Sequence, residues 1–251
     1  MRAHLIWDWN GTLLRDDNAV LDATNEALAK LHIPGAVVDG VVPPEILPGM
    51  PLLTVERYQA LFTRPLAKFY SAVFGRNVDR SEFLRLETLF REAYLWRLEA
   101  TELNEGSLPA LTSWSTAGYS QSLLSLWGHE ELRRRTTALG ITDYFVRIDG
   151  RSRPVTENTD GKAEPLRDHL EALSREGDEP VRVAVAAGRV AMIGDALDDA
   201  AAATAAGIPC VLFAGGSHSP AQLEATGAPV AATLSEAVAL ARKAIEDARS
   251  L

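Results

Sequence analysis

The stretch HLIWDWNGTLL, residues 4–14, decides the fold of this chain. A short apolar run ends on Asp8, and the chain then turns through Asn10 and Gly11. An Asn-Gly pair between apolar runs is also a strong signal for a β-hairpin turn, so this segment alone leaves a hairpin open. A carboxylate at the end of a buried strand is instead a placed chemical group. A second group of this kind elsewhere in the chain would favour that interpretation.

The second group lies in RVAMIGDALDDAAAATAAG, residues 189–207. Another apolar run ends on Asp195, Asp199 follows, and an alanine-rich segment closes at Gly207. One alternative is that Asp195 only caps the helix that follows it. However, strand ends of one parallel sheet converge at its carboxyl edge, where ligands bind in open α/β folds. Two converging carboxylates suit Mg²⁺, which is typically held by one or two of them together with substrate phosphate and water.

A lysine and a serine extend the pattern. Lys162 lies at the expected start of a helix that runs to about Arg175, where the helix dipole disfavours a cation. This placement indicates an anionic partner, and a solvated surface lysine is the alternative. Ser125 is expected at the end of a strand over residues 119–125, with Ser122 as the nearest rival.

In the order Asp8, Ser125, Lys162 and Asp195, these residues resemble the four motifs of the haloacid dehalogenase superfamily. Its first motif is Asp-x-Asp-Gly-Thr and its fourth is Gly-Asp-x-x-x-Asp. The resemblance implies that Asp8 is a nucleophile that accepts a phosphoryl group, which Lys162 and Ser125 bind. One position departs from the motif, because Asn10 replaces the second aspartate and removes the usual proton donor.

The resemblance also implies a Mg²⁺ site. Asp8, Asp195 and the main-chain carbonyl of Asn10 would hold the ion. Asp199 would act through a bound water or orient Lys162.

The order of elements predicts an α/β fold, with a Rossmann-like parallel sheet covered on both faces and an inserted α-helical cap domain. The core would comprise residues 1–14 and 105–251, and the cap residues 15–104, which resemble the type-1 cap of phosphoglycolate phosphatase-like enzymes. Strands are expected at 3–8, 119–125, 143–148, 189–194 and 209–214. Helices are expected at 19–32, 54–74, 81–100, 129–139, 163–175 and 235–250. The run 181–187 could be a further strand, and residues 37–50 are rich in Pro, Gly and Val.

Composition excludes several classes of protein. A net charge of −9 argues against a nucleic-acid partner, whose phosphates favour a basic face. We expect no membrane association, because no apolar run reaches the length of a bilayer span and no signal peptide precedes the first strand. Cys210 is the only cysteine, which excludes an intrachain disulfide and makes the cytoplasm the natural compartment. We interpret Cys210 as a core residue.

The residues together predict a Mg²⁺-dependent phosphatase that hydrolyses a small phosphorylated metabolite through an aspartyl-phosphate. One alternative is a phosphonate hydrolase of the same superfamily, in which Lys30 or Lys68 would form a Schiff base with the substrate. Another is a non-catalytic metabolite-binding protein on the same fold. A nicotinamide oxidoreductase is disfavoured, because no Gly-x-Gly-x-x-Gly follows an expected strand. Candidate specificity residues in the cap are His32, Arg57, Arg64 and Lys68. Oligomeric state has no signature in the sequence.

Overall fold

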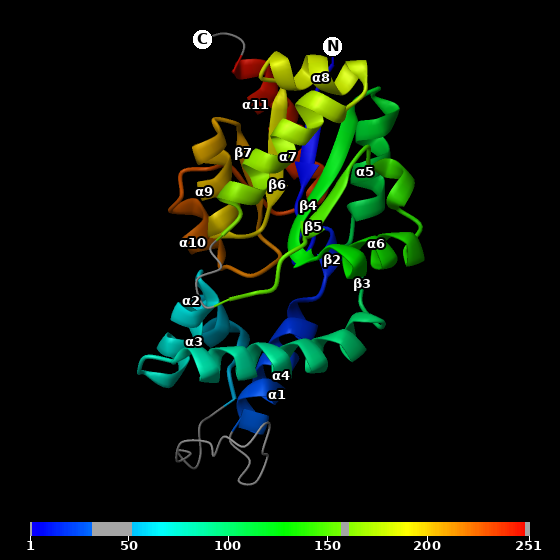
Figure 1. Cartoon of the computed structure of the whole chain (residues 1–251). Coiled ribbons are helices and arrows are strands. Elements are labelled where there is room, and N and C mark those ends of the chain that lie inside the picture. The colour runs from blue at the N-terminus through cyan, green and yellow to red at the C-terminus, as the bar shows by residue number, and fades with distance from the viewer. Residues whose placement is uncertain (1, 32–51, 157–160, 249–251) are drawn as a thin grey trace. The chain divides into compact units, whose positions relative to one another are not determined.

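The computed structural model describes residues 2–31, 52–156 and 161–248 (Figure 1). Contacts divide the chain into two compact units. The core unit comprises Met1–Arg15, Glu102–Pro154 and Gly161–Leu251, and the helical unit comprises Asp16–Thr101 with Val155–Asp160. These divisions fall close to those expected from the sequence, except that the stretch beginning at Val155 groups with the helical unit.

The core unit is built on one six-stranded parallel sheet in the order β5-β4-β1-β6-β7-β8. Its strands are β1 (His4–Trp7), β4 (Ser120–Gly128), β5 (Ile148–Arg151), β6 (Val190–Gly194), β7 (Cys210–Phe213) and β8 (Val230–Ala231). In the register of the central strand, Trp7 pairs with Leu123 on one side and with Ile193 on the other. The predicted α/β sheet is therefore confirmed. The hairpin alternative is wrong, because both neighbours of β1 are parallel strands from distant parts of the sequence.

Helices cover both faces of this sheet (Figure 1). One face carries α7 (Ala163–Glu176), α8 (Glu179–Ala186) and α9 (Leu197–Ala206), and the other carries α5 (Ser107–Thr116) and α11 (Leu234–Asp247). The remaining elements of the unit are α6 (His129–Ala138), the 3₁₀ turn η1 (Thr142–Tyr144) and α10 (Pro220–Glu224).

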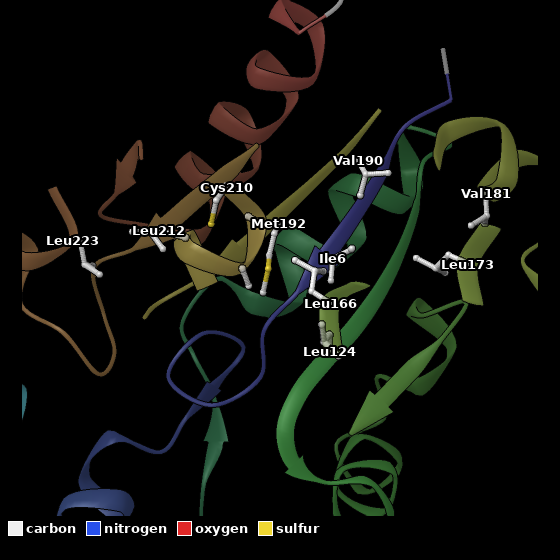
Figure 2. Packing of buried hydrophobic residues seen from close by; sticks show 13 residues of the cluster. Ile6, Leu124, Leu166, Leu173, Val181, Val190, Met192, Cys210, Leu212 and Leu223 are labelled. Atoms are coloured by element: carbon white, nitrogen blue, oxygen red, sulfur yellow. The ribbon is translucent and has the colours of Figure 1, made fainter. Parts of the chain in front are cut away.

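Alternate residues along the strands point into the layer beneath α7 and α9. Figure 2 shows Ile6, Met192 and Leu212 from three neighbouring strands packed with Leu166 of α7. Cys210 belongs to the same cluster, and its burial raises the pKa of the thiol above the usual range. The interpretation of Cys210 as a core residue is therefore confirmed.

Four sequence expectations for individual elements are corrected. The run 181–187 is part of helix α8, because its buried residues Val181 and Ala184 are three apart and Pro180 lies in the first turn, where no N–H is needed. Residues 143–147 do not form a strand: a 3₁₀ turn ends at Tyr144, and β5 begins only at Ile148. The strand expected to end at residue 125 continues to residue 128. The expected helix 54–74 is instead two helices, Val55–Leu61 and Leu66–Phe74.

The helical unit contains α1 (Asp17–Leu31), α2 (Val55–Leu61), α3 (Leu66–Phe74) and α4 (Arg80–Leu98). Pro65 separates α2 from α3, because proline lacks the N–H that a continuous helix would require. A capping box between Asp79 and Glu82 begins α4, which packs along α1. Phe69, with Tyr58 and Tyr70 against it, centres an aromatic core.

Two expectations cannot be compared with the structure. His32 and the segment 37–50 lie outside the described residues. Among the residues that are described, no helix combines the length and the apolar character that a membrane span requires.

The first two crossings between the units, after Arg15 and before Glu102, run beside each other in the core unit. After β1 the chain forms β2 (Leu14–Arg15), which pairs antiparallel with β3 (Glu102–Leu103). Arg15 donates a hydrogen bond to Glu102 at 3.0 Å on the exposed side of this ladder. The outgoing and returning segments of the chain are therefore held as a pair.

A buried polar chain crosses the sheet at the end remote from Asp8. His169 Nδ1 lies 2.6 Å from Asp149 Oδ2, and its Nε2 lies 2.8 Å from Ser122 Oγ. Ser122 Oγ lies 2.8 Å from His4 Nε2, and His4 Nδ1 lies 2.8 Å from Ser120 Oγ. An ionised Asp149 can only accept a hydrogen bond, so His169 must donate to it through Nδ1. His169 Nε2 then accepts from Ser122, Ser122 accepts from His4 Nε2, and His4 Nδ1 accepts from Ser120. Each neutral imidazole therefore has one consistent tautomer. Every link in the chain is satisfied while both rings stay neutral.

We predict that His4 does not titrate in the physiological range. Burial, with the charge of a protonated His169 as the smaller cause, lowers its pKa to about 3, whereas an unfolded chain takes up this proton near pH 6.5. The contribution of His4 to stability is therefore constant above pH 6.5 and declines as the pH falls from 6.5 toward 3. Histidine NMR, assigned with a His4→Gln variant, should show no His4 midpoint between pH 8 and 5. A midpoint near 6.5 would contradict the neutral chain.

Candidate active site

Two aspartates follow neighbouring strand ends at the carboxyl edge of the sheet. Asp8 follows β1 directly and Asp195 follows β6 directly. The backbone N–H of Asp8 donates to the carbonyl of Ile193 at 2.9 Å, which extends the ladder by one residue beyond β1. Strand β1 has β4 and β5 on one side and β6, β7 and β8 on the other, so the strand order reverses direction at β1. The two aspartates therefore lie at the topological switch point of the sheet, where ligands bind in open α/β folds.

Lys162 reaches these aspartates from the start of α7. Its side chain is only 4% exposed, which excludes a solvated surface lysine. The ammonium Nζ donates to Asp8 Oδ1 and to Asp199 Oδ1. The other oxygen of Asp199 accepts the backbone N–H groups of Asp195 at 3.1 Å and Ala196 at 3.0 Å. Asp199 is therefore anchored by backbone and directs Lys162 toward Asp8.

Asp195 does not act as the cap of α9. One of its oxygens, Oδ2, accepts the backbone N–H of Ser217 at 2.6 Å. The other, Oδ1, lies 3.3 Å from the hydroxyl of Thr12, which also lies 3.2 Å from Asp8 Oδ2. With Lys162 on the remaining oxygen of Asp8, the two carboxylates face each other across Thr12.

Ser125 lies beside Asn10, within β4 rather than at its end. Its hydroxyl is 3.3 Å from Asn10 Oδ1 and accepts the backbone N–H of Trp127 at 3.0 Å. The rival, Ser122, is committed to the buried chain through His169. The structure thus places Ser125 next to the first motif.

Both tryptophans that flank Asp8 are fully buried, in agreement with a packing role. Trp7 Nε1 donates to Gln121 at 2.9 Å within the core.

Three glycines, which have no side chain, lie directly against the carboxylates of Asp195 and Asp199. A Cβ added to Gly11 would lie 2.4 Å from Asp195 Oδ2, and one added to Gly216 would lie 2.0 Å from the same atom. A Cβ on Gly194 would lie 2.2 Å from Asp199 Oδ2. Gly11 and Gly194 are visible in the sequence as neighbours of the acidic motifs. No pattern in the sequence indicated that the loop after β7, which contains Gly216 and Ser217, would contact Asp195.

Burial controls the charge of this cluster. Burial, opposed by Lys162 and assisted by the charge of Asp199, raises the pKa of Asp8 to about 6. Burial, with the charge of Asp8 second, raises the pKa of Asp195 well above its usual range. Burial also disfavours the charged form of Lys162, but Asp199 and Asp8 more than offset this effect and raise its pKa. The ammonium stays charged, and its carboxylate neighbours need a further positive charge.

The donor set fits a divalent cation. One carboxylate oxygen from each of Asp8, Asp195 and Asp199 lies within 4.8 Å of the others. Carboxylate oxygens are the ligands that hard cations prefer. The oxygens of Asp199 accept the Lys162 ammonium and two backbone N–H groups, whereas the facing oxygens of Asp8 and Asp195 share the one hydroxyl proton of Thr12. The facing oxygens are therefore the better placed ligands.

The comparison with protein families identifies the second half of the core unit. Residues 161–237, which include Lys162, Asp195 and Asp199, match the HAD-hydrolase-like family model. No curated protein matches the chain.

Solved structures match nearly the whole chain. A predicted phosphatase from Clostridium acetobutylicum covers 97% of this chain and 98% of its own, with a TM-score of 0.71 and 16% identity. CbbY from Rhodobacter sphaeroides, solved with xylulose-1,5-bisphosphate, covers 94% and 96%, with a TM-score of 0.65 and 16% identity. Protein tyrosine kinase A (PtkA) from Mycobacterium tuberculosis covers 97% of both chains, with a TM-score of 0.64 and 23% identity. Identities this low establish the fold rather than the activity.

The predicted resemblance to the haloacid dehalogenase superfamily is thereby confirmed in fold and in the matched segment. The chain resembles the hydrolases and phosphatases of this class, as predicted.

We predict that the bare backbone at Gly11 is required for stability. Gly11 and Gly118 both have positive φ, at 73° and 78°, so alanine at either position costs about 1–2 kcal/mol of backbone strain. Nothing lies within 4 Å of a Cβ at Gly118, whereas Gly11 faces Asp195. Gly11→Ala should therefore cost a further ~1–3 kcal/mol for overpacking. Urea unfolding of the two variants measures this difference, and equal losses would contradict the prediction.

Proposed function

We propose that this chain is a Mg²⁺-dependent phosphatase that hydrolyses a small phosphorylated metabolite through an aspartyl-phosphate on Asp8. The observation that carries the proposal is the buried ammonium of Lys162, held between Asp8 and Asp199 beside Asp195. A structural ion pair needs only one carboxylate, whereas Lys162 contacts two. Burying several charges together is costly, and such clusters gather at functional sites.

The metal ligands would be Asp8, Asp195 and, as the family resemblance implies, the main-chain carbonyl of Asn10. Asp199 would serve the site through Lys162 instead. When bound, Mg²⁺ supplies positive charge that offsets the phosphoryl oxygens and the two carboxylates.

The residues of the chain account for both halves of the reaction. A carboxylate oxygen of Asp8 forms a bond to phosphorus, and the bond from phosphorus to the leaving oxygen breaks, with the electron pair going to that oxygen. Lys162 and the Ser125 hydroxyl bind the phosphoryl oxygens. In the second half, water attacks the phosphoryl group, inorganic phosphate and a proton are released, and the carboxylate is regenerated. The leaving oxygen takes its proton from water or from the substrate, since Asn10 cannot supply it.

Asp8→Asn should abolish Mg²⁺-dependent phosphatase activity with the fold intact. The two side chains are nearly isosteric, but the amide is no nucleophile toward phosphorus. A screen of phosphorylated metabolites, run with Mg²⁺ on the wild type and on this variant, measures the effect and identifies substrates. Full turnover in freshly purified Asp8→Asn would remove Asp8 from this role.

The choice of a small phosphorylated substrate is supported by CbbY, whose structure was solved in complex with xylulose-1,5-bisphosphate. We assign specificity to the helical unit as a type-1 cap. Of its candidate residues, Arg57 and Lys68 are exposed, and the Arg64 guanidinium lies 5.8 Å from the centre of the Phe62 ring. With a single buried cysteine and a net negative charge, we place the enzyme in the cytoplasm, without a nucleic-acid or membrane partner.

The phosphonate-hydrolase alternative has little support. A Schiff-base lysine is desolvated or placed beside another cation. Lys30 is instead paired with Glu26 at 2.7 Å, and Lys68 is exposed. A non-catalytic binding protein remains the alternative if Asp8 cannot be trapped with Mg²⁺ and fluoroberyllate while a metabolite binds.

Asn10 should make the phosphoenzyme slow to hydrolyse and favour good leaving groups. A positioned acid–base group contributes about 10²–10⁴-fold, and an amide cannot titrate at neutral pH. We expect phospho-Asp8 to accumulate, and Asn10→Asp to raise the turnover of alkyl phosphates by at least roughly tenfold. Steady-state rates with alkyl and aryl phosphates test this.

One control is essential, because Asn10-Gly11 is prone to deamidation. Peptide mass spectrometry must show asparagine at position 10 in the assayed sample. If Asn10→Asp changes little, a residue of the helical unit supplies the proton and the proposed role of Asn10 is wrong.

A second candidate is transfer of the phosphoryl group to a hydroxyl acceptor. PtkA, the structural neighbour at 23% identity, is by name a protein tyrosine kinase. Slow attack by water at Asn10 would lengthen the lifetime of phospho-Asp8 and let another acceptor compete. A chase of the phosphoenzyme with tyrosine peptides distinguishes the two: inorganic phosphate alone supports the phosphatase, and phosphotyrosine supports the kinase.

A further inference from the structure

The hydroxyl of Thr12 touches the facing oxygens of both aspartates. Thr12 is completely buried. Its single hydroxyl proton is shared between two acceptors at 3.2 and 3.3 Å. The position of its backbone therefore contributes, together with Lys162 and the N–H of Ser217, to how the two carboxylates are oriented.

The backbone of Thr12 lies in a tight turn. The N–H of Leu14 donates to the carbonyl of Trp9 at 2.9 Å, and the N–H of Gly11 donates to the carbonyl of Leu14 at 3.0 Å. These bonds close the turn, whereas the carbonyls of Gly11, Thr12 and Leu13 take no part in them and require other donors.

Asn104, the residue after β3, provides those donors. Its side-chain amide lies 2.8 Å from the carbonyl of Thr12, 3.2 Å from that of Gly11 and 3.4 Å from that of Leu14. Its own backbone N–H donates to the carbonyl of Leu13 at 2.8 Å. Four consecutive carbonyls of the turn thus lie within hydrogen-bonding distance of one residue from the returning crossing.

Ser107 provides one further hydrogen bond to the turn. Its buried hydroxyl donates to the carbonyl of Leu13 at 3.0 Å, one residue away from Thr12. The side chain of Glu102, two residues before Asn104, accepts a hydrogen bond from the exposed Arg15 at 3.0 Å. These two residues offer graded comparisons with Asn104.

We infer that Asn104 is a positioning residue for the phosphatase site: its amide holds the turn so that the Thr12 hydroxyl keeps Asp8 and Asp195 oriented for a divalent cation. The inference rests on the proposed function. Without the amide, Thr12 can shift, and the facing carboxylate oxygens repel each other and rotate apart.

Metal binding tests the inference without any substrate. Mn²⁺ serves as a probe for Mg²⁺, and electron paramagnetic resonance of the free ion gives its dissociation constant. Asn104→Asp keeps the side-chain shape but loses both amide donors. We expect it to raise the Mn²⁺ dissociation constant about tenfold, the scale of one lost hydrogen bond to a charged site. Ser107→Ala should have a smaller effect, and Glu102→Gln should leave the constant unchanged.

A double-mutant cycle separates positioning from general destabilisation. Thr12→Val removes the hydroxyl at constant volume, and Thr12→Ser retains it. If Asn104 acts through Thr12, then adding Thr12→Val to Asn104→Asp should raise the dissociation constant little beyond the single variants, and Thr12→Ser should stay near the wild type. Multiplying effects, about a hundredfold in the double variant, would overturn the inference.

Stability and activity complete the test. All constants are measured far below the melting temperature, and Asn104→Ala replaces Asn104→Asp if the latter does not fold. A lower melting temperature with an unchanged Mn²⁺ constant would show a structural role only and would overturn the inference while the phosphatase stands. Failure of the wild type to hydrolyse any phosphate would instead reject the proposed function, and the Mn²⁺ cycle would still decide the role of Asn104.

Discussion

The rest of the site depends on one buried interaction, the ammonium of Lys162 between the carboxylates of Asp8 and Asp199. Removing charges from water is costly, and a buried pair is repaid only when its remaining hydrogen-bonding groups are satisfied. Here the second oxygen of Asp199 is satisfied by two backbone N–H groups, so the lysine has a fixed counter-ion in addition to Asp8. Loss of Lys162 would leave three buried carboxylates with no cation among them.

The sheet makes this arrangement possible. Adjacent parallel strands present Asp8 and Asp195 at one edge, and α7 and α9 deliver Lys162 and Asp199 from one face of the sheet. The local backbone also contributes to this arrangement. Three glycines let the carboxylates approach the main chain closely, and Asn104 holds the turn that contains Thr12. The same short turn therefore serves the fold, as the exit from β1, and the site, as the support of both carboxylates.

Asn10 gives the site its distinctive chemical character. An aspartate at this position would add a further negative charge to a buried acidic cluster and a group able to move a proton. The amide keeps the contact with Ser125 at 3.3 Å but carries neither the charge nor the proton. Compared with an aspartate at position 10, the asparagine leaves less negative charge to be neutralised around a bound phosphoryl group. It also removes the side chain that would transfer the proton. Under the proposed function, this one substitution predicts a phosphoenzyme that is slow to hydrolyse.

The sequence by itself determined the α/β class, the two aspartates at strand ends, and Lys162, because strands that end on a polar residue and a lysine at a helix start are local patterns. It did not separate strand from helix at 181–187, since three alternating valines satisfy both periods over so short a run. Only the tertiary structure decided that Ser125 faces Asn10 while Ser122 joins His4 and His169. Only it revealed Asn104 and Thr12, because their roles arise from hydrogen bonds between residues about 90 to 180 positions apart, which no local pattern records.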